Sequence, residues 1–297
     1  MGKLKKAIGV GFLVLLVWGG YVTYALATLK PQFSARWGAV NEKETNVIID
    51  VNFGKPLMIP GTFSDIRITL NGIEIGKATQ VNYSMTTPKI GIKITFDNQK
   101  IVRAFVNYMN SGQFGTVSVY VGGKFLWLVP FGETLSYNIS QDLLAYSNIT
   151  YPSKKVGPFY SPAVKGIASE WKGISGNYGI ITSHVRVYNP NDFPLPVGNL
   201  EYVAYFNGYP LVSGNTTETV IIPPKGTAII TVKNILNLSL IPKVWELHIN
   251  NNETTKIHAI IYVVINLRGQ SYRVKITDVT KTIKTDLLAS INRGVTR

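Results

Sequence analysis

Short runs of apolar residues, many of them alternating with polar residues, fill most of the chain beyond residue 30. Valine, isoleucine, threonine and tyrosine are frequent in these runs, which is typical of β-strands. Clusters of glycine, proline and asparagine separate one run from the next. The pattern predicts antiparallel β structure, and the strands expected in the second half cover residues 179–188, 200–206, 217–222, 227–233, 257–266 and 271–279.

Two segments have the helical period instead. Residues 97–112 open with potential capping residues and place three apolar side chains on one helical face: Ile101, Phe105 and Tyr108. Residues 238–252 have a similar pattern, with Ser239 as a potential cap and Pro242 tolerable in a first turn. The sequence therefore predicts one short helix in each half.

The order of landmarks repeats along the chain, which indicates two copies of one unit. Each copy opens with a tryptophan, continues through a Pro-Leu pair and an Asn-Gly turn, and ends in Asp-Leu-Leu-Ala. Equivalent landmarks are about 140 residues apart, and they are Trp37 and Trp171, Pro56-Leu57 and Pro194-Leu195, Asn71-Gly72 and Asn207-Gly208, and residues 142–145 and 286–289.

The landmarks and the intervening composition predict four parts: an N-terminal segment 1–30, a first β domain 37–146, a linker 147–168 and a second β domain 169–291. The linker contains prolines and has no hydrophobic period, so we expect an extended and fairly stiff spacer. Hairpin turns at Gly122-Gly123 and at Arg268-Gly269 are expected before the last strand of each copy.

The second copy interrupts strand sequence with N-P-N-D-F-P-L-P. Proline has no N–H group for a sheet, so a strand should end at this run, which contains Pro190, Pro194 and Pro196. Asn189 and Asn191 are expected to form Asx turns with nearby backbone. Phe193 and Leu195 are expected to turn into the core.

Aromatic residues give further expectations about the core. Trp127 and Trp245 are expected to be buried, because each lies within an apolar segment. Around the second Asn-Gly turn, core packing and an exposed binding patch both remain open for four residues: Tyr202, Tyr205, Phe206 and Tyr209.

The N-terminal segment is apolar. Lys3, Lys5 and Lys6 precede residues 7–29, which contain no charge and would span roughly 35 Å as a helix at about 1.5 Å per residue. This predicts a membrane-spanning anchor with a cytoplasmic N-terminus and the rest of the chain outside. A cleaved signal peptide is the alternative, because Ala25-Leu26-Ala27 matches an A-x-A cleavage pattern and would make the protein secreted.

The net charge is +14, and the second half is the more basic. Such a surface attracts anionic lipids or acidic glycans, or it is simply a solvated basic surface. No nucleic-acid-binding motif accompanies it, so nucleic acid is not an expected partner. Glycosylation sequons agree with export, and they lie at Asn82, Asn138, Asn148, Asn215, Asn237 and Asn252.

Candidate chemistry is sparse. The chain has no cysteine, which excludes disulfides and thiolate chemistry. Its histidines, His184, His248 and His258, lie in predicted strands or the second helix, so structural roles are expected. No nucleotide-binding, metalloprotease or nucleophile motif is present, and no carboxylate pair can be selected for glycosidase chemistry. We therefore expect no enzyme activity, no cofactor and no metal site.

A strand ending in Asn-Pro-Asn, followed by F-P-L-P-V, another strand and an Asn-Gly turn, resembles the WHy domain (water stress and hypersensitive response; late embryogenesis abundant group 2). The resemblance covers the second copy well. It covers the first copy more loosely, because Asn52-Phe53-Gly54 replaces the Asn-Pro-Asn motif, although Pro56-Leu57 is retained. The whole arrangement is similar to tandem, membrane-anchored archaeal members.

The resemblance implies an all-β chain with two tandem fibronectin-III-like antiparallel β-sandwiches, each with one short helix, after the N-terminal transmembrane helix. It also implies a non-catalytic role in protection against desiccation or other stress, through shielding of protein clients or the membrane surface. The alternatives are a structural cell-surface protein, such as a stalk or filament subunit, and an adhesin for acidic glycans or lipids.

Overall fold

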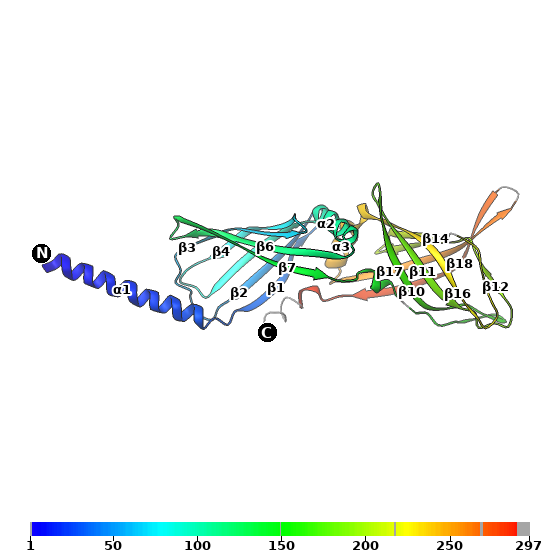
Figure 1. Ribbon diagram of the computed structural model, residues 1–297, viewed down its shortest axis with the longest axis horizontal. Coiled ribbons are helices and arrows are strands. Elements are labelled where there is room, and N and C mark those ends of the chain that lie inside the picture. Colours follow the sequence, from blue (N-terminus) through cyan, green and yellow to red (C-terminus); the bar gives the residue numbers. More distant parts are fainter. Residues whose placement is uncertain (1, 149, 217, 268–269, 290–297) are drawn as a thin grey trace. The chain divides into compact units, whose positions relative to one another are not determined.

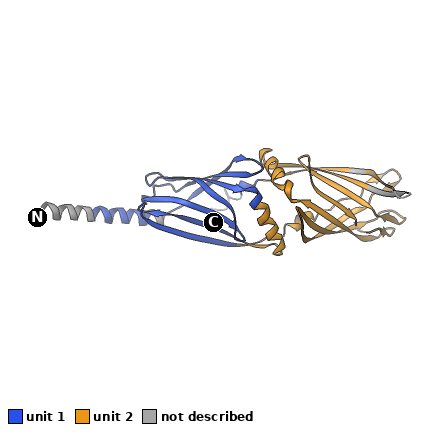
Figure 2. Ribbon diagram, turned by 90° about the horizontal axis from the view of Figure 1, so that it is seen from above, with its two compact units in different colours: residues 1–100, 116–137, 286–297 blue, residues 101–115, 138–285 orange. Residues whose placement is uncertain are grey.

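The computed structural model describes residues 2–148, 150–216, 218–267 and 270–289 (Figure 1). It divides the chain into two compact units, made of residues 1–100, 116–137 and 286–297, and of residues 101–115 and 138–285 (Figure 2). Each unit contains one seven-stranded antiparallel sheet. The predicted turn at Arg268-Gly269 and the predicted domain end at residue 291 lie outside the described residues.

The sheet of the first unit runs, in the order of hydrogen-bonded neighbours, β1 (Gln32–Val40), β2 (Glu44–Asn52), β5 (Lys89–Asp97), β4 (Ile73–Tyr83), β3 (Gly61–Leu70), β6 (Phe114–Phe125) and β7 (Val129–Ser140). Buried valines and isoleucines of β2, β3 and β5 form its core, at Val47, Val51, Ile66, Ile90 and Ile94. The strands twist strongly along the sheet (Figure 1).

The sheet of the second unit has the corresponding order: β10 (Ala163–Ser175), β11 (Tyr178–Tyr188), β16 (Thr227–Asn237), β14 (Tyr209–Thr216), β13 (Leu200–Phe206), β17 (Thr254–Leu267) and β18 (Gln270–Lys284). The prediction of a mostly β chain with two β-sandwich-like domains is confirmed at this level. The fibronectin-III-like arrangement of separate sheets stays a prediction, since each sheet is hydrogen-bonded continuously from edge to edge.

The predicted landmarks occupy equivalent places in the two sheets. Trp37 of β1 pairs with Val47, and Trp171 of β10 pairs with Ile181. In both strands the register shifts immediately after the tryptophan, which marks a β-bulge at the same point.

The two Asn-Gly pairs form equivalent hairpin turns. Asn71 and Asn207 have φ values of 50° and 49°, in the left-handed region that suits asparagine before glycine. The Asn71 Oδ1 accepts the backbone N–H of Thr116 at 2.7 Å, and the Asn207 Oδ1 accepts that of Lys256 at 2.9 Å. Each turn therefore closes its own hairpin and is also tied to the strand beside that hairpin in the sheet, β6 in the first unit and β17 in the second.

Both predicted helices are present. Helix α2 (Asn98–Asn110) begins where Asp97 Oδ1 accepts the N–H groups of Gln99 and Lys100, which is an N-terminal cap. In the second unit a 3₁₀ turn, η2 (Leu238–Leu240), precedes α3 (Ile241–Asn250), with Pro242 in the first turn as predicted.

The cap predicted at Ser239 is wrong. Leu240 is the N-cap residue of α3 and makes no side-chain cap hydrogen bond. The side-chain cap lies one turn earlier, where Asn237 Oδ1 accepts the Ser239 N–H at 3.1 Å and starts the 3₁₀ turn. A sequence period cannot distinguish these two starting points, since either residue type caps a helix.

Helix α2 is grouped with the second unit, although its sequence lies in the first copy. The indole N–H of Trp171 donates to Asn110 Oδ1 at 2.7 Å, and the Phe105 ring meets the Trp171 ring edge-on at 6.2 Å. The predicted boundary at residue 146 follows the sequence repeat, whereas these contacts hold α2 to β10.

The segment predicted as a stiff spacer, residues 147–168, contains regular structure. It starts at the end of the 3₁₀ turn η1 (Leu144–Ser147), continues through a small hairpin of β8 (Lys155–Val156) and β9 (Phe159–Tyr160), and ends inside β10. Its pairing partners lie far away in the sequence, since Ala163 already pairs with Tyr188. The hydrophobic pattern within the segment gives no information about a pairing partner so far away in the sequence.

The hairpin between β6 and β7 turns at Leu126 and Trp127, not at the predicted Gly122-Gly123. Strand β6 runs through both glycines; a Cβ at Gly123 would lie 1.9 Å from the carbonyl oxygen of Thr62. The glycines therefore allow close approach of β3. Leu126 and Trp127 have φ values of 51° and 59°, and the Leu128 N–H donates to the Phe125 carbonyl at 3.1 Å.

This turn has the type I′ form, which normally requires Asn-Gly. Placing a leucine and a tryptophan there costs about 1–2 kcal/mol for each residue. The prediction that Trp127 lies in the core is also wrong, because its side chain is 57% exposed. Trp245, by contrast, is half-buried in α3.

The N-terminal segment forms a helix, α1 (Gly2–Ala27). Two of its aromatic side chains donate to the connection between β2 and β3: Trp18 Nε1 to the Met58 carbonyl, and the Tyr21 hydroxyl to the Pro56 carbonyl, both at 2.8 Å. Within the part of the chain that the structure describes, no helix combines the length and apolar character needed to cross a membrane.

A ladder of polar side chains crosses the second sheet. The Tyr202 hydroxyl donates to Asn234 Oδ1 at 2.6 Å, and Asn234 Nδ2 donates to Ser183 Oγ at 2.8 Å. Gly214 of the intervening strand leaves room for it, because a Cβ there would lie 2.3 Å from the Tyr202 ring. Burial raises the pKa of Tyr202 to about 12.

Replacing Tyr202 by phenylalanine tests this ladder. At neutral pH the Tyr202→Phe variant should lose about 1–3 kcal/mol of unfolding free energy, since Asn234 Oδ1 loses its donor. In the wild type, the unfolded state ionises first as the pH rises above 10, so the contribution disappears as the pH rises towards 12. Urea unfolding across this range should show the two stability curves converging; parallel curves would contradict the assignment.

Candidate functional site

The side chain of Asn189 is fully buried at the end of β11. Its Nδ2 donates to the carbonyls of Phe193, Ile222 and Pro223, at 2.7, 3.3 and 3.2 Å. Its Oδ1 accepts both the backbone N–H and the side-chain amide of Asn191 at 2.9 Å. We call this set of bonds the Asn189 clamp. The predicted Asx turn is confirmed for Asn189 but not for Asn191, whose Oδ1 accepts the N–H of the distant Tyr160.

The clamp fixes the run of prolines against a neighbouring strand. Strand β12 (Leu195–Val197), which contains Pro196, pairs with β15 (Val220–Ile222), next to the carbonyls that Asn189 holds. Leu195 packs against the buried cluster of Val187, Ile222 and Ile230, as predicted. The β12–β15 pair is a small sheet separate from the seven-stranded one.

Phe193 does not enter the core. It is 38% exposed and packs edge-on against Phe159 of the β8–β9 hairpin, with ring centroids 5.3 Å apart. Asn191 holds the same hairpin, because its amide donates to the Tyr160 carbonyl and its Oδ1 accepts the Tyr160 N–H, both at 2.8 Å. The prediction for Phe193 fails because the linker covers this side of the motif.

The remaining motif prolines lie on the outer side of the run. Lys225 Nζ donates to the Pro190 carbonyl at 2.6 Å and lies 3.2 Å from Asp192. Pro194 and Pro196 are exposed. These residues shape the connection, and the side-chain hydrogen bonds come from the two asparagines.

An apolar cavity of about 520 Å³ lies beside the β12–β15 pair. Valine, leucine and isoleucine side chains line most of its wall, from Val164, Val185, Val187, Leu195, Val197, Ile230, Val232 and Ile261. Glu201, Tyr202 and Thr216 supply polar groups on one side. We call this the apolar cavity. A cavity of this kind can hold an apolar chain or ring.

Of the residues that line the apolar cavity, the sequence singled out Leu195, Pro196 and Tyr202, and not the valines and isoleucines of its wall. Alternate valines in a strand have the same pattern whether they face a packed core or an empty cavity. The nearest sequence signal was the Asn-Pro-Asn motif, which is followed by Leu195 and Pro196 of the cavity wall but does not itself indicate a cavity.

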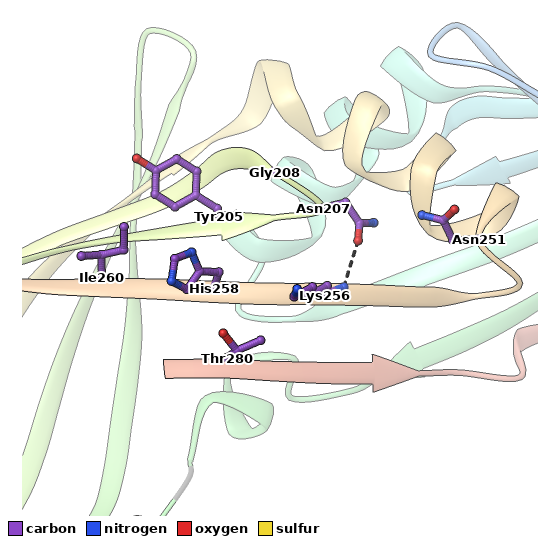
Figure 3. Close-up of a pocket in the computed structure, with 8 residues that line it drawn as sticks. All are labelled: Tyr205, Asn207, Gly208, Asn251, Lys256, His258, Ile260 and Thr280. Atoms are coloured by element: carbon purple, nitrogen blue, oxygen red, sulfur yellow. Dashed lines mark hydrogen bonds between the residues drawn. The ribbon is translucent and has the colours of Figure 1, made fainter. Parts of the chain in front are cut away.

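A second cavity, of about 740 Å³, is lined by six polar or aromatic residues together with Gly208 and Ile260 (Figure 3); the six are Tyr205, Asn207, Asn251, Lys256, His258 and Thr280. Asn207 Nδ2 is buried and has no hydrogen-bond partner among the described residues. His258 lies 3.5 Å from Asp278, whose pKa is lowered by a hydrogen bond from Lys275 and by His258. We call this the polar cavity.

The aromatic residues around the second Asn-Gly turn do not form an exposed patch. Tyr202, Tyr205, Phe206 and Tyr209 are all half-buried. Tyr202 belongs to the polar ladder, and Tyr205 lies beside His258 with ring centroids 6.3 Å apart. The core alternative is therefore the one observed.

The histidines lie apart from one another in hydrogen-bonded positions. His248 is buried between Thr255 and Thr285, at 2.8 and 2.9 Å, and desolvation lowers its pKa although Glu253 acts in the opposite direction. His184 lies 3.4 Å from Thr231. Within residues 2–148, 150–216, 218–267 and 270–289, no group of histidine and acidic side chains is arranged to hold a metal ion.

The corresponding connection of the first unit is built differently. Asn52 Oδ1 accepts the Gly54 N–H at 3.0 Å, and Leu57 is buried. Pro56 and Met58 offer their carbonyls to α1 instead of to a neighbouring strand. The connection that lacks the Asn-Pro-Asn motif thus bonds the N-terminal helix instead of a neighbouring strand.

The predicted sequons lie mainly at the surface. Asn82, Asn138, Asn148, Asn215 and Asn252 are exposed, whereas Asn237 is half-buried and caps η2. Asn148 Oδ1 also accepts the Ile167 N–H at 2.8 Å. A glycan on Asn237 would disturb the start of the second helix; the other positions have space for one.

One protein family matches the part of the chain that contains the Asn189 clamp. Residues 184–277 match the family described as "Late embryogenesis abundant protein", so the segment with the Asn189 clamp, the apolar cavity and the polar cavity is similar to that family. No curated protein matches the chain.

Similar solved structures are remote. A protein from Archaeoglobus fulgidus is 22% identical, with a TM-score of 0.32, over 42% of this chain and 99% of its own. Red sea bream transglutaminase is 10% identical, with a TM-score of 0.22, over 86% of this chain and 31% of its own. A β-glucuronidase from glycoside hydrolase family 2 is 11% identical, with a TM-score of 0.21, over 86% of this chain and 23% of its own.

The Asn189→Ala variant tests the clamp. It removes the amide that donates to three backbone carbonyls and accepts the Asn191 N–H, so the free energy of unfolding of the second unit should fall by about 2–4 kcal/mol. Asn215→Ala is the control, because Asn215 is exposed and its loss should change stability by less than about 0.5 kcal/mol. Calorimetry on the full chain measures both, and equal unfolding temperatures would contradict the clamp.

Proposed function

We propose that this chain is a non-enzymatic, membrane-anchored extracytoplasmic protein that protects proteins or membrane surfaces during desiccation or related stress. The observation that carries the proposal is the match of residues 184–277 to the late embryogenesis abundant family. The identical strand order of the two sheets supports a tandem arrangement of two such domains, as in the archaeal members that the sequence resembles.

The location rests on the N-terminal sequence. Three lysines precede the uncharged residues 7–29, a pattern typical of an anchor with its N-terminus in the cytoplasm. The sequons, most of them at exposed positions, agree with a body outside the membrane. Cleavage after Ala25-Leu26-Ala27 would release the same body as a secreted protein.

The mechanism we propose is weak shielding. A folded domain with a net positive charge stays soluble and repels its own copies, and it attracts anionic proteins and lipid headgroups without a specific site. Interposed between labile surfaces as water is lost, it would slow their aggregation. This requires a stable fold, which the buried hydrogen bonds of the second unit provide.

A drying assay tests protection. The full chain in lipid vesicles, dried and rehydrated with a labile reporter enzyme, should preserve more enzyme activity than vesicles with an equal mass of albumin. The Asn189→Ala variant should protect less at temperatures where its second unit unfolds. Recovery no better than with albumin would contradict the protective function.

A second candidate function is the binding of an apolar ligand in the apolar cavity. The specific observation is its size and lining, since about 520 Å³ bounded mainly by aliphatic side chains is typical of a small-molecule site. The polar groups of Glu201 and Thr216 at its side would orient the polar end of an amphipathic molecule. Ligand binding would then be a second function of the chain beside its protective function.

A cavity-filling variant tests this candidate. Val232→Trp should occupy the apolar cavity and abolish the fluorescence of an apolar naphthalene dye that binds there. Ile229→Trp is the matched control, because Ile229 lies on the same strand, is 55% exposed and does not line the cavity. Equal dye binding by the two variants would exclude the cavity as the site.

A further inference from the structure

The exposed turn of the β6–β7 hairpin, residues 126–129, carries four adjacent apolar side chains that nothing in the described chain covers. Leu126, Trp127, Leu128 and Val129 are 45, 57, 81 and 55% exposed. We call this the apolar tip. Lys124 beside it is exposed, and the residues from Gly122 to Gly132 include no acid.

The conformation of the turn disfavours these side chains. Both central residues have positive φ, a conformation that the hairpins at Asn71-Gly72 and Asn207-Gly208 form with asparagine and glycine. In the sequence, the equivalent connection of the second copy has Arg268-Gly269. A leucine and a tryptophan therefore occupy strained positions where polar residues and glycine would fold better, which points to a function for their exposed surfaces.

The apolar tip and helix α1 lie at the same end of the first unit. The Leu126 N–H donates to the Pro60 carbonyl at 2.8 Å, so the tip is tied to the β2–β3 connection. The same connection accepts the hydrogen bonds of Trp18 and Tyr21 from α1. Lys55 of this connection lies 4.0 Å from the centre of the Tyr24 ring.

We propose that the apolar tip inserts into the interfacial region of the lipid bilayer, beside the N-terminal helix, and fixes the first unit against the membrane. Tryptophan and leucine are suited to the boundary between headgroups and acyl chains, and Lys55 and Lys124 would meet the phosphates there. The inference rests on the proposed membrane anchor, because α1 determines which end of the unit faces the bilayer.

A polarity-sensitive fluorophore tests the insertion. The chain has no cysteine, so Leu128→Cys can be labelled at one position in the full chain. Ile221→Cys is the matched control, because Ile221 is an apolar residue of the second unit with a comparable exposure of 65%. The chain is reconstituted in vesicles of phosphatidylcholine with a minority of phosphatidylglycerol, and flotation after an alkaline wash first shows whether it is anchored.

In anchored chains, the label at position 128 should emit at shorter wavelength than the label at 221 and be quenched several-fold more by brominated lipid. Equal, water-like signals in chains that float would overturn the insertion and leave the anchor standing. Chains that the alkaline wash removes would overturn the anchor and the insertion together. Efficient crosslinking between two copies at position 128 would assign the tip to a protein contact and also overturn the proposal.

A double variant separates folding from membrane contact. Leu126→Asn with Trp127→Gly restores the residues that this turn type prefers, so the unfolding temperature should stay the same or rise. In the same variant, lipid quenching of the label at 128 should fall several-fold. Unchanged quenching would overturn the proposal, since the two replaced side chains would then not hold the tip in the bilayer.

Discussion

The side-chain amide of Asn189 is the interaction on which the second domain most depends. It is buried, it donates to three carbonyls and it accepts the Asn191 N–H, so removing it would break several hydrogen bonds at once, two of them buried. Because it fixes the end of β11 next to β15, it also sets where β12 lies. The wall of the apolar cavity formed by Leu195 and Val197 follows from that position.

The first domain uses the same connection for another purpose. Its strand order is the same, but Phe53 and Gly54 stand where the proline and the second asparagine of the motif would be, and the connection receives hydrogen bonds from Trp18 and Tyr21. The strained Leu126–Trp127 turn is tied to this connection through Pro60. One sheet topology thus supports a clamped cavity in the second unit and an exposed apolar turn in the first.

Local patterns predicted much of this fold and little of the candidate site. The period of residues 97–112 and the two Asn-Gly pairs identified α2 and two hairpins, because caps and left-handed turns depend on adjacent residues. The hairpin at Lys155–Tyr160 and the exposure of Trp127 could not be predicted in this way. The first depends on Asn191, about thirty residues further on, and the second contradicts the usual preference of an apolar segment for the core.

Hydrogen–deuterium exchange on the full chain, compared in vesicles and in detergent, tests the division of roles most directly. The account predicts that the bilayer slows exchange at residues 53–60 and 124–129 of the first unit. It predicts the same exchange in both environments at residues 189–197 and 220–223, since the Asn189 clamp is internal to the second unit. Protection at the clamp region and none at residues 124–129 would contradict the account.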